Sequence, residues 1–474
     1  TGSRSLTLYG GREFFMKKNK IRMMTGRKLQ AEELLEELYC AYFDARKNKR
    51  GTASQLRFEL NLERNLSVLA REISTGHYEV GRSICFVVDK PVKREIFAAD
   101  FRDRVVHHLL FNWLSPMLER SFVADSYSCR KGKGTLYGIE RTRKHIRQCT
   151  RNFTQTAYVL KVDISGYFMS INRQRLLDTI LTEMEKYRHR RCGRGKMTWE
   201  ERIDYTLATD LLRKVILNDP TQNCIFRGNR SAWNGLPANK SLFNSEEGCG
   251  LPIGNLTSQL FSNVYLSAFD NRMKREEGLR YYGRYVDDII IVHPDSHYLA
   301  QLLGRMERIL KTDYGLTMHP RKRLLQRADQ GFDFLGMREH GSVLLPGRRL
   351  KRGLRYALDA YAYEMETKYL SYERFCHHRA QLNSYIGLMG HCCAGRLIEG
   401  VRKRLLTCVQ DRTEEEALAL LSGESDMLTS VSTDKKDVVA TSCVRCLSLR
   451  PMIQVLGCMV NRAAVVFIFH TLFC

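Results

Sequence analysis

The first third of the chain alternates between helical and strand-like spacing of its hydrophobic residues. Apolar side chains recur every three or four positions from Glu32 to Arg46, which predicts a surface helix. The spacing becomes strand-like from Cys85 to Val92 and returns to helical from Asp103 to Leu114. Together these segments predict a small lobe of mixed helices and strands.

The middle of the chain places strands and a helix around acidic residues. The apolar run from Ala157 to Ile164 predicts a buried strand. The segment from Arg284 to Val292 predicts two short extended stretches that meet at Asp287-Asp288. Between them, Gln259 to Phe269 carries one apolar stripe, as an amphipathic helix does. We therefore expect an α+β core.

The remaining regions differ in composition. Residues 187–250 are loop-rich and basic and are expected to form an insertion, whose charge suits a solvated surface and a nucleic-acid surface equally well. After Pro346 the pattern is helical to about Cys408, which predicts a C-terminal helical lobe. Residues 1–26 are taken as an N-terminal extension, in which the part before Met16 carries no motif. Residues 413–474 are taken as an uncertain, partly disordered tail.

Charge and cysteine content narrow the class of protein. The 474 residues carry a formal net charge of +24, which favours a polyanionic partner, although a basic surface can also serve solubility alone. The 15 cysteines are scattered without a secretory leader, so we expect reduced thiols in a cytoplasmic protein. Cys443 and Cys446 form a single C-x-x-C, which is weak evidence for zinc. The apolar stretch from Ala463 to Cys474 is too short to cross a bilayer, so no membrane partner is expected.

Three aspartates carry the candidate chemistry. Asp163 ends the predicted buried strand, and Asp287 and Asp288 occupy the apex of a predicted tight hairpin with apolar flanks. Carboxylates brought together repel one another unless a cation neutralises them, and oxygen ligands suit Mg²⁺. Two such ions held ~4 Å apart can activate a 3′-hydroxyl and stabilise the leaving pyrophosphate. An Asp-Asp pair by itself also commonly caps a turn.

The order of the motifs resembles that of reverse transcriptases. Segments similar to the successive palm motifs of that family are Lys161-Val162-Asp163-Ile164 with Phe168, Gly254 through Gln259, Tyr285-Val286-Asp287-Asp288, Lys322, and Phe332 through Gly336. Lys93 through Ile96, Asp103 through Val106 and Ser126 through Arg130 are similar to fingers motifs of bacterial members. The resemblance implies a right-hand polymerase, with fingers at 27–150, a palm of antiparallel sheet and helices at 151–340, and a helical thumb at 341–412.

The resemblance also implies roles for individual residues. Asp163 and Asp287 would bind two Mg²⁺ ions, for which Mn²⁺ can substitute, with Asp288 and the Ile164 carbonyl completing the site. Phe168 occupies the position of the aromatic steric gate that excludes the ribose 2′-hydroxyl. The residues expected to contact the incoming nucleotide or template are Arg94, Arg130, Ile253, Gly254, Gln259 and Lys322. Each of the two arginines, taken alone, could equally be a surface residue. Phe334, Leu335 and Gly336 correspond to the primer grip.

One loop indicates a subgroup within the family. The segment from Leu251 to Gln259, with Pro237 and Lys240 through Phe243 upstream, resembles reverse transcriptases of diversity-generating retroelements. Ile253 replaces a long polar side chain beside the nascent base pair and cannot hydrogen-bond there, so lower fidelity is expected. Ordinary packing of Ile253 under the loop is the alternative. The resemblance further implies that errors concentrate at template adenines.

The expected function is therefore synthesis of cDNA on a template-repeat RNA, with mutagenic diversification of a target gene. The implied partners are the template RNA, a nucleic-acid primer, dNTPs and a small basic helical accessory protein. One alternative is an intron-type or retron-type reverse transcriptase of ordinary fidelity. A second is a non-catalytic RNA-binding protein on a polymerase scaffold.

Overall fold

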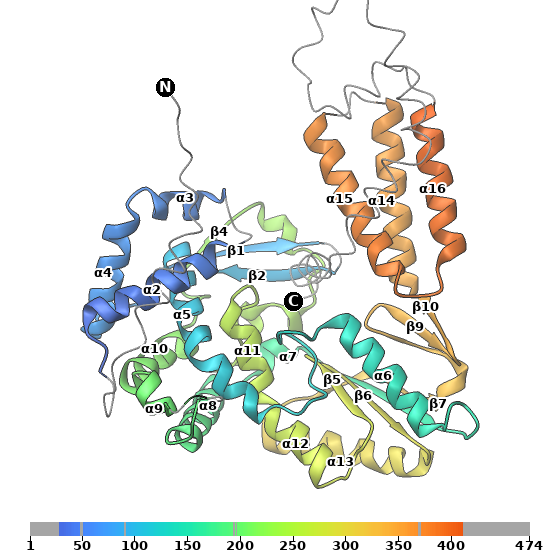
Figure 1. Cartoon of the computed structure of the whole chain (residues 1–474), viewed down its shortest axis with the longest axis horizontal. Coiled ribbons are helices and arrows are strands. Elements are labelled where there is room, and N and C mark those ends of the chain that lie inside the picture. The colour runs from blue at the N-terminus through green and yellow to red at the C-terminus, as the bar shows by residue number, and fades with distance from the viewer. Residues whose placement is uncertain are drawn as a thin grey trace, which may run out of the picture. The chain divides into compact units, whose positions relative to one another are not determined.

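The computed structural model describes residues 28–47, 51–89, 92–192, 195, 197–367 and 371–410 (Figure 1). The predicted extension at 1–26, the tail at 413–474 and the Cys443–Cys446 motif lie outside these residues. The described chain divides into two compact units. One contains residues up to Lys133 and from Leu160 to Leu325, and the other contains Gly134–Val159 and residues from Gln326 onward.

The first unit contains two sheets and most of the helices. One sheet has the order β2-β1-β4 and the other the order β5-β6-β3-β7. The strands are β1 (Ser83–Val88), β2 (Arg94–Ala98), β3 (Tyr158–Ile164), β4 (Cys224–Phe226), β5 (Tyr282–Tyr285), β6 (Asp288–His293) and β7 (Met318–Arg327). The helices are α2 (Ala31–Arg46), α3 (Ala53–Glu59), α4 (Leu62–Ser74), α5 (Phe101–Leu118), α7 (Tyr167–Ser170), α8 (Arg173–Tyr187), α9 (Trp199–Arg202), α10 (Tyr205–Leu217), α11 (Leu256–Tyr265), α12 (Ser267–Arg275) and α13 (Ser296–Tyr314).

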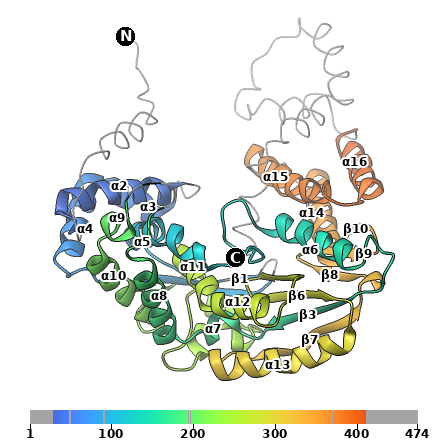
Figure 2. The same ribbon diagram turned by 60° about the horizontal axis from the view of Figure 1, so that its bottom comes forward.

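Helix α5 is the centre of the helical packing in this unit. It packs against both α2 and α11, and twelve of its side chains are buried, so it is apolar around much of its circumference. Helices α8 and α10 pack against each other beside it (Figure 2). The carboxylate of Asp100 caps α5 by accepting a hydrogen bond from the backbone N–H of Arg102 at 3.2 Å.

The hairpin of β5 and β6 carries the two neighbouring aspartates. The strands are antiparallel, and Tyr285 pairs with Asp288, so the turn contains only Val286 and Asp287. All four residues of β5 and the central four of β6 are buried. Burial on both arms fixes the register of the hairpin and therefore the position of its turn.

The second unit has a sheet of its own and four helices. Its elements are α6 (Thr135–Cys149), β8 (Phe332–Phe334), β9 (Met337–His340), β10 (Val343–Pro346), α14 (Arg348–Thr367), α15 (Tyr372–Met389) and α16 (Gly395–Gln410). The sheet is antiparallel with the order β10-β9-β8. One core joins Ile139 of α6, Met337 of β9 and Leu354 of α14. Helix α14 packs against both α15 and α16 (Figure 1).

Most of the predicted elements are present, with several differences. The predicted helix at 259–269 is two helices, because the chain leaves helical geometry at Leu266 (φ −101°, ψ 5°). The predicted strand from Cys85 ends at Val88. The region 187–250 is not only loops: it contains α10, whose N-terminus is capped by the Asp204 carboxylate. These differences leave the α+β class unchanged.

The compact units do not follow the predicted residue ranges. We predicted that fingers extend to residue 150, yet α6 packs with β9 and α14 in the second unit. Its apolar face is buried among residues of that unit, which explains the grouping. The assignment of fingers, palm and thumb to sequence ranges therefore stays a prediction.

Candidate active site

The end of β3 lies directly against the turn of the β5–β6 hairpin. The backbone N–H of Ile164 donates a hydrogen bond to the carbonyl oxygen of Asp287 at 3.2 Å. This bond joins residues that are far apart in the sequence and places Asp163 next to Asp287. The structure thus brings together the acidic residues that the sequence predicted to meet.

Burial and mutual repulsion act on the paired aspartates. Burial raises the pKa of Asp287 to about 7, and the negative charges of Asp288 and Asp163 add to the rise, while Lys322 opposes it. Burial also raises the pKa of Asp288, and Lys161 opposes that rise. The ionised forms of Asp287 and Asp288 are therefore disfavoured, and a cation bound beside them would stabilise those forms.

Two lysines are the cations nearest the aspartates. The Lys322 ammonium lies 2.7 Å from an Asp163 carboxylate oxygen, and the Lys161 ammonium lies 3.5 Å from a carboxylate oxygen of Asp288. Lys322 is about half exposed, so its side chain can move without breaking core packing. Sequence reasoning proposed Lys322 as a site residue and quoted Lys161 only as part of a palm motif, without a role. Its position two residues before Asp163 on one strand face was the available signal.

The donor set fits a hard divalent cation. Within the described residues, no group of three or more His, Cys, Asp and Glu side chains converges on one point. Asp163 instead faces Lys322, and Asp288 faces Lys161. Burial, and to a smaller extent mutual repulsion, raises the pKa values of Asp287 and Asp288, and carboxylate oxygens are the ligands that Mg²⁺ prefers. Asp163 and Asp287 could hold such an ion once the Lys322 ammonium moves away from Asp163.

The turn that presents Asp287 has an unfavourable backbone conformation. Val286 has φ +53°, in the left-handed region that β-branched residues rarely adopt. Two-residue hairpin turns with a positive φ at the first turn position normally carry glycine there. A valine in this conformation costs roughly 1–3 kcal/mol, so surrounding contacts must hold it.

A buried polar network provides those contacts. The backbone N–H of Val286 donates to the Ser128 hydroxyl at 3.2 Å, and its carbonyl accepts from the Arg284 guanidinium at 2.9 Å. Arg284 is completely buried and forms two hydrogen bonds to the Asp270 carboxylate, at 2.6 and 2.8 Å. Asn263 also belongs to this network, because its side-chain oxygen accepts a hydrogen bond from the Ser128 hydroxyl at 3.1 Å. Sequence reasoning missed this network.

The predicted steric gate and the fidelity position belong to one apolar cluster. Phe168 and Ile253 are partly buried and pack against a core of Cys85, Phe97, Met169 and Leu242. Backbone hydrogen bonds fix both positions: Leu251 donates to the Phe168 carbonyl, and Phe97 donates to the Ile253 carbonyl, each at 2.8 Å. The loop and the aromatic ring are therefore held by the same packing.

The next residue of the loop requires glycine. Gly254 has φ +128°, and a Cβ atom there would lie 3.0 Å from the Phe97 carbonyl oxygen. Gln259 lies in α11 and is half-buried. Their predicted contacts with the nucleotide remain predictions.

Further cations act on the aspartate group. Burial lowers the pKa of Lys240, and the positive charges of Lys322 and Arg94 lower it further, while Asp163 and Asp287 oppose the change. Lys240 thus lies within electrostatic reach of Asp163 and Asp287, and Arg94 lies within electrostatic reach of Lys240. Sequence reasoning proposed Arg94 and quoted Lys240 only as part of the subgroup resemblance. Such cations suit the phosphates of an incoming nucleotide.

Two other predicted residues occupy different surroundings. The Arg130 guanidinium donates to the carbonyl oxygens of Val123 and Ser126 at 2.9 and 3.1 Å and pairs with Glu119 at 3.3 Å. These bonds stabilise its own loop, and its predicted contact with substrate stays a prediction. Leu335 and Gly336, with φ of +48° and +83°, form the turn between β8 and β9 in the second unit, next to Phe334. Their role as a primer grip is likewise a prediction.

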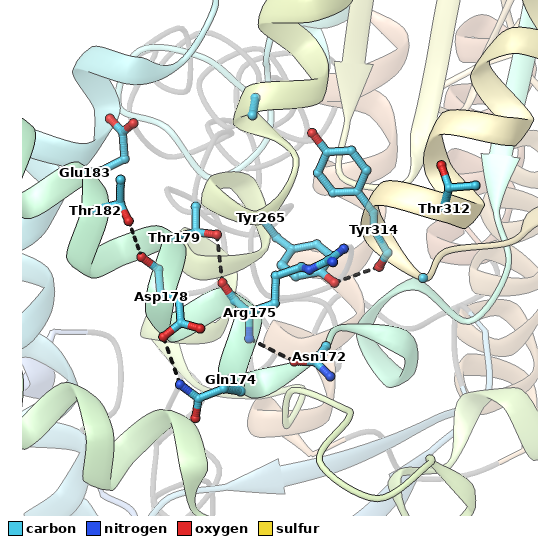
Figure 3. Close-up of a pocket in the computed structure, with 12 residues that line it drawn as sticks. Asn172, Gln174, Arg175, Asp178, Thr179, Thr182, Glu183, Tyr265, Thr312 and Tyr314 are labelled. Carbon is cyan, nitrogen blue, oxygen red and sulfur yellow. Dashed lines mark hydrogen bonds between the residues drawn. The ribbon is translucent and has the colours of Figure 1, made fainter.

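An open pocket of about 850 Å³ lies elsewhere in the first unit. It is lined by residues of α8, among them Arg175 and Asp178, and by the C-terminal end of α13 (Figure 3). The Tyr265 hydroxyl on one wall donates to the Tyr314 carbonyl at 2.7 Å. None of the predicted site residues lines this pocket.

The sequence matches the family model of reverse transcriptase (RNA-dependent DNA polymerase) over residues 90–338. The chain belongs to the reverse transcriptase family. The match begins before β2, ends in β9 and includes all three aspartates. This reverse transcriptase has no match among curated proteins.

Solved structures that match this chain include telomerases from Candida species. The chain is 12% identical to an apo telomerase from Candida tropicalis truncated from its C-terminal domain, with a TM-score of 0.41 over 56% of this chain and 55% of that one. A telomerase from Candida albicans in complex with a TWJ fragment of telomeric RNA is 10% identical, with a TM-score of 0.38 over 76% and 68%. The reverse transcriptase thus spans about half the length of the first of these chains. None of its described helices is long and apolar enough to span a membrane.

Proposed function

We propose that this reverse transcriptase is an active RNA-directed DNA polymerase whose reaction centre is formed by Asp163 and Asp287. The observation that carries the proposal is the hydrogen bond between Ile164 and Asp287, which joins two strand ends into one acidic group. Divalent metal ions bound there would lower the barrier to attack by the primer 3′-hydroxyl and to departure of pyrophosphate. Mg²⁺ is the expected ion, and Mn²⁺ can substitute.

Each neighbouring residue then has a defined task. Asp163 and Asp287 hold the cations, with the Ile164 carbonyl beside them, and Asp288 supports the site from its position opposite Lys161. Arg94, Lys240 and Lys322 supply positive charge for the triphosphate. Phe168 is fixed in the apolar cluster with Ile253 and blocks a ribose 2′-hydroxyl.

Primer extension on a defined RNA template tests this activity. The wild-type protein with Mg²⁺ or Mn²⁺ is expected to extend the primer with dNTPs, and Asp287→Asn to abolish extension. Asp178→Asn is the matched control, because Asp178 is an aspartate on α8 outside this group. A non-catalytic RNA-binding protein would give no incorporation by the wild type, or the same activity in Asp287→Asn.

We further propose error-prone synthesis of the kind used by diversity-generating retroelements. The supporting observation is that Ile253, beside the steric-gate position, belongs to an apolar cluster and offers no polar side chain for monitoring a base pair. Sequencing of cDNA made on a defined RNA is expected to show errors concentrated at template adenines, and Ile253→Gln to reduce them. Errors spread uniformly over all four template bases would favour the intron-type or retron-type alternative.

The proposed partners follow from this function. They are a template-repeat RNA, a nucleic-acid primer, dNTPs and a small basic helical accessory protein. Cys85, Cys149 and Cys392 are free thiols, which is compatible with the proposed cytoplasmic location. Copurification of flanking RNA and of a small basic protein with the tagged enzyme would test both partners.

A further inference from the structure

Three cations converge on the ring of Tyr187 at the end of α8. Arg120 lies 5.6 Å from the ring centroid, and Lys186 and Arg190 each lie 5.3 Å from it. Arg120 comes from the turn after α5, whereas the other two flank Tyr187 itself. Tyr187 is buried, so the ring is a fixed platform for the cations. We name these four residues the Tyr187 cluster.

The positive charge of the Tyr187 cluster is only partly balanced. Lys186 pairs with Glu183 at 3.1 Å. Within the described part of the chain, neither Arg120 nor Arg190 has a carboxylate within ion-pair distance, and both are exposed. Like charges held beside one ring repel one another, so an anion bound there would be stabilised.

The nearby carboxylates are occupied by other groups. Glu200 accepts from Arg188 and from His189, each at 2.9 Å. Glu201 accepts from the backbone N–H of Thr198 at 2.6 Å, where it completes a capping box. These acidic side chains are therefore committed locally. Arg120 donates one hydrogen bond to the Arg191 carbonyl oxygen at 3.2 Å, and the positive charge of Arg120 and Arg190 remains available to a ligand.

The geometry of the arginines suits phosphate. A guanidinium stacked on an aromatic ring keeps its N–H edge free for bidentate hydrogen bonds. The same arrangement recurs beside the cluster, where Arg202 lies 5.3 Å from the Trp199 ring centroid and Arg188 5.5 Å from that of Tyr205. A surface with several stacked arginines can contact successive phosphates of one strand.

We propose that the Tyr187 cluster binds the phosphate backbone of an RNA outside the reaction centre. This inference rests on the proposed function, because a polymerase that copies a long RNA must hold template beyond the few nucleotides at its aspartates. It also extends that function, since the cluster comes from the turn after α5, from α8 and from the loop after α8 rather than from the β5–β6 hairpin. The chain's net charge of +24 favours the same polyanionic partner.

The test compares two variants with equal loss of charge. Arg120→Gln/Arg190→Gln removes two cations from the cluster, and Arg64→Gln/Arg71→Gln removes two exposed cations from α4. Binding of a structured RNA is measured against salt concentration, together with extension on a short primer–template. The slope of log affinity against log salt is negative. The cluster variant is expected to reduce its magnitude by about 2, and the α4 variant to leave it unchanged. Arg120→Lys/Arg190→Lys should retain most of the slope, because it keeps the charge.

Several results would overturn the inference. A cluster variant that binds RNA like wild type, or an α4 variant with the same loss, would show that the cluster has no specific role. Competition by polyglutamate as strong as by RNA would assign the site to an acidic protein. Failure of the wild type to extend the short primer–template would count against the proposed activity alone, since the salt slope is measured without catalysis.

Discussion

Arg284, which lies three residues before Asp287, forms a fully buried ion pair with Asp270. The guanidinium and the carboxylate are 2.6 Å apart. The same guanidinium donates to the carbonyl of Val286, so the pair connects the core to the turn that presents the aspartate. Asp270 is further tied by the Tyr282 hydroxyl at 2.6 Å. The position of the proposed reaction centre thus depends on a charge pair that is fully buried.

Removal of Asp270 is expected to destabilise the protein strongly. Asp270→Ala leaves a buried, unpaired Arg284 and should lower the free energy of unfolding by about 3–5 kcal/mol. Asp313→Ala is the control, because it breaks a half-exposed pair with Arg272 and should cost less than about 1 kcal/mol. Urea unfolding measures both values. Equal losses of unfolding free energy in the two variants would show that the buried pair contributes no more to stability than the half-exposed pair.

Replacement of Val286 by glycine is expected to destabilise the protein less than replacement by alanine. At φ +53° an L side chain costs roughly 1–2 kcal/mol, which glycine avoids. Val286→Gly and Val286→Ala both remove the side-chain packing, so comparison of their unfolding free energies isolates the backbone contribution. The glycine variant should be more stable than the alanine variant by about 1 kcal/mol. A more stable alanine variant would contradict the left-handed conformation.

Sequence reasoning was sufficient for the acidic group because its signals are local. Asp163 follows an apolar strand, and Asp287 lies at a hairpin apex between apolar arms, so each position could be predicted from its neighbours. Helix α10 was missed although Ala208, Leu211, Leu212 and Ile216 have helical spacing, because the surrounding segment is basic and rich in loops.

The support of the turn could not be predicted in this way. Asp270 lies on α12, Asn263 on α11 and Ser128 in the loop after α5, and no local pattern pairs any of them with Arg284. Only the tertiary fold brings these polar groups to one buried place. The grouping of α6 with β9 and α14 has the same cause, since Ile139 meets its partners across nearly two hundred residues of sequence.

Glu339 is expected to make stability depend on pH. Burial raises its pKa to about 7, although Arg143 opposes the rise, so the folded protein binds a proton that the unfolded chain releases at lower pH. Stability should therefore fall by roughly 2 kcal/mol as pH rises from about 5 to about 8. Glu339→Gln should remove this part of the fall, whereas Glu373→Gln, at an exposed site in α15, should leave it. Unfolding curves with the same pH dependence in wild type and Glu339→Gln would contradict the raised pKa.

Phe168 is expected to control the choice of sugar. Phe168→Ala removes a ring held in place by the apolar cluster and should improve ribonucleotide use relative to deoxynucleotide use on the order of 10-fold or more. Ratios of kcat/KM for matched rNTP and dNTP pairs give the measurement. Phe43→Ala is a suitable comparison, because this half-buried ring lies on α2 in the same unit and outside the apolar cluster that holds Phe168. Unchanged discrimination in Phe168→Ala would remove Phe168 from the gate position.

Iron-directed cleavage tests most directly whether Asp163 and Asp287 share a divalent cation. Fe²⁺ replaces Mg²⁺ at such sites and, with ascorbate, cuts the backbone nearby, and mass spectrometry locates the cuts. The structure predicts cuts near Ile164 and near Val286, both suppressed by excess Mg²⁺ and both absent in Asp287→Asn. Cuts at only one of the two segments, or cuts unaffected by Mg²⁺, would contradict a shared metal site.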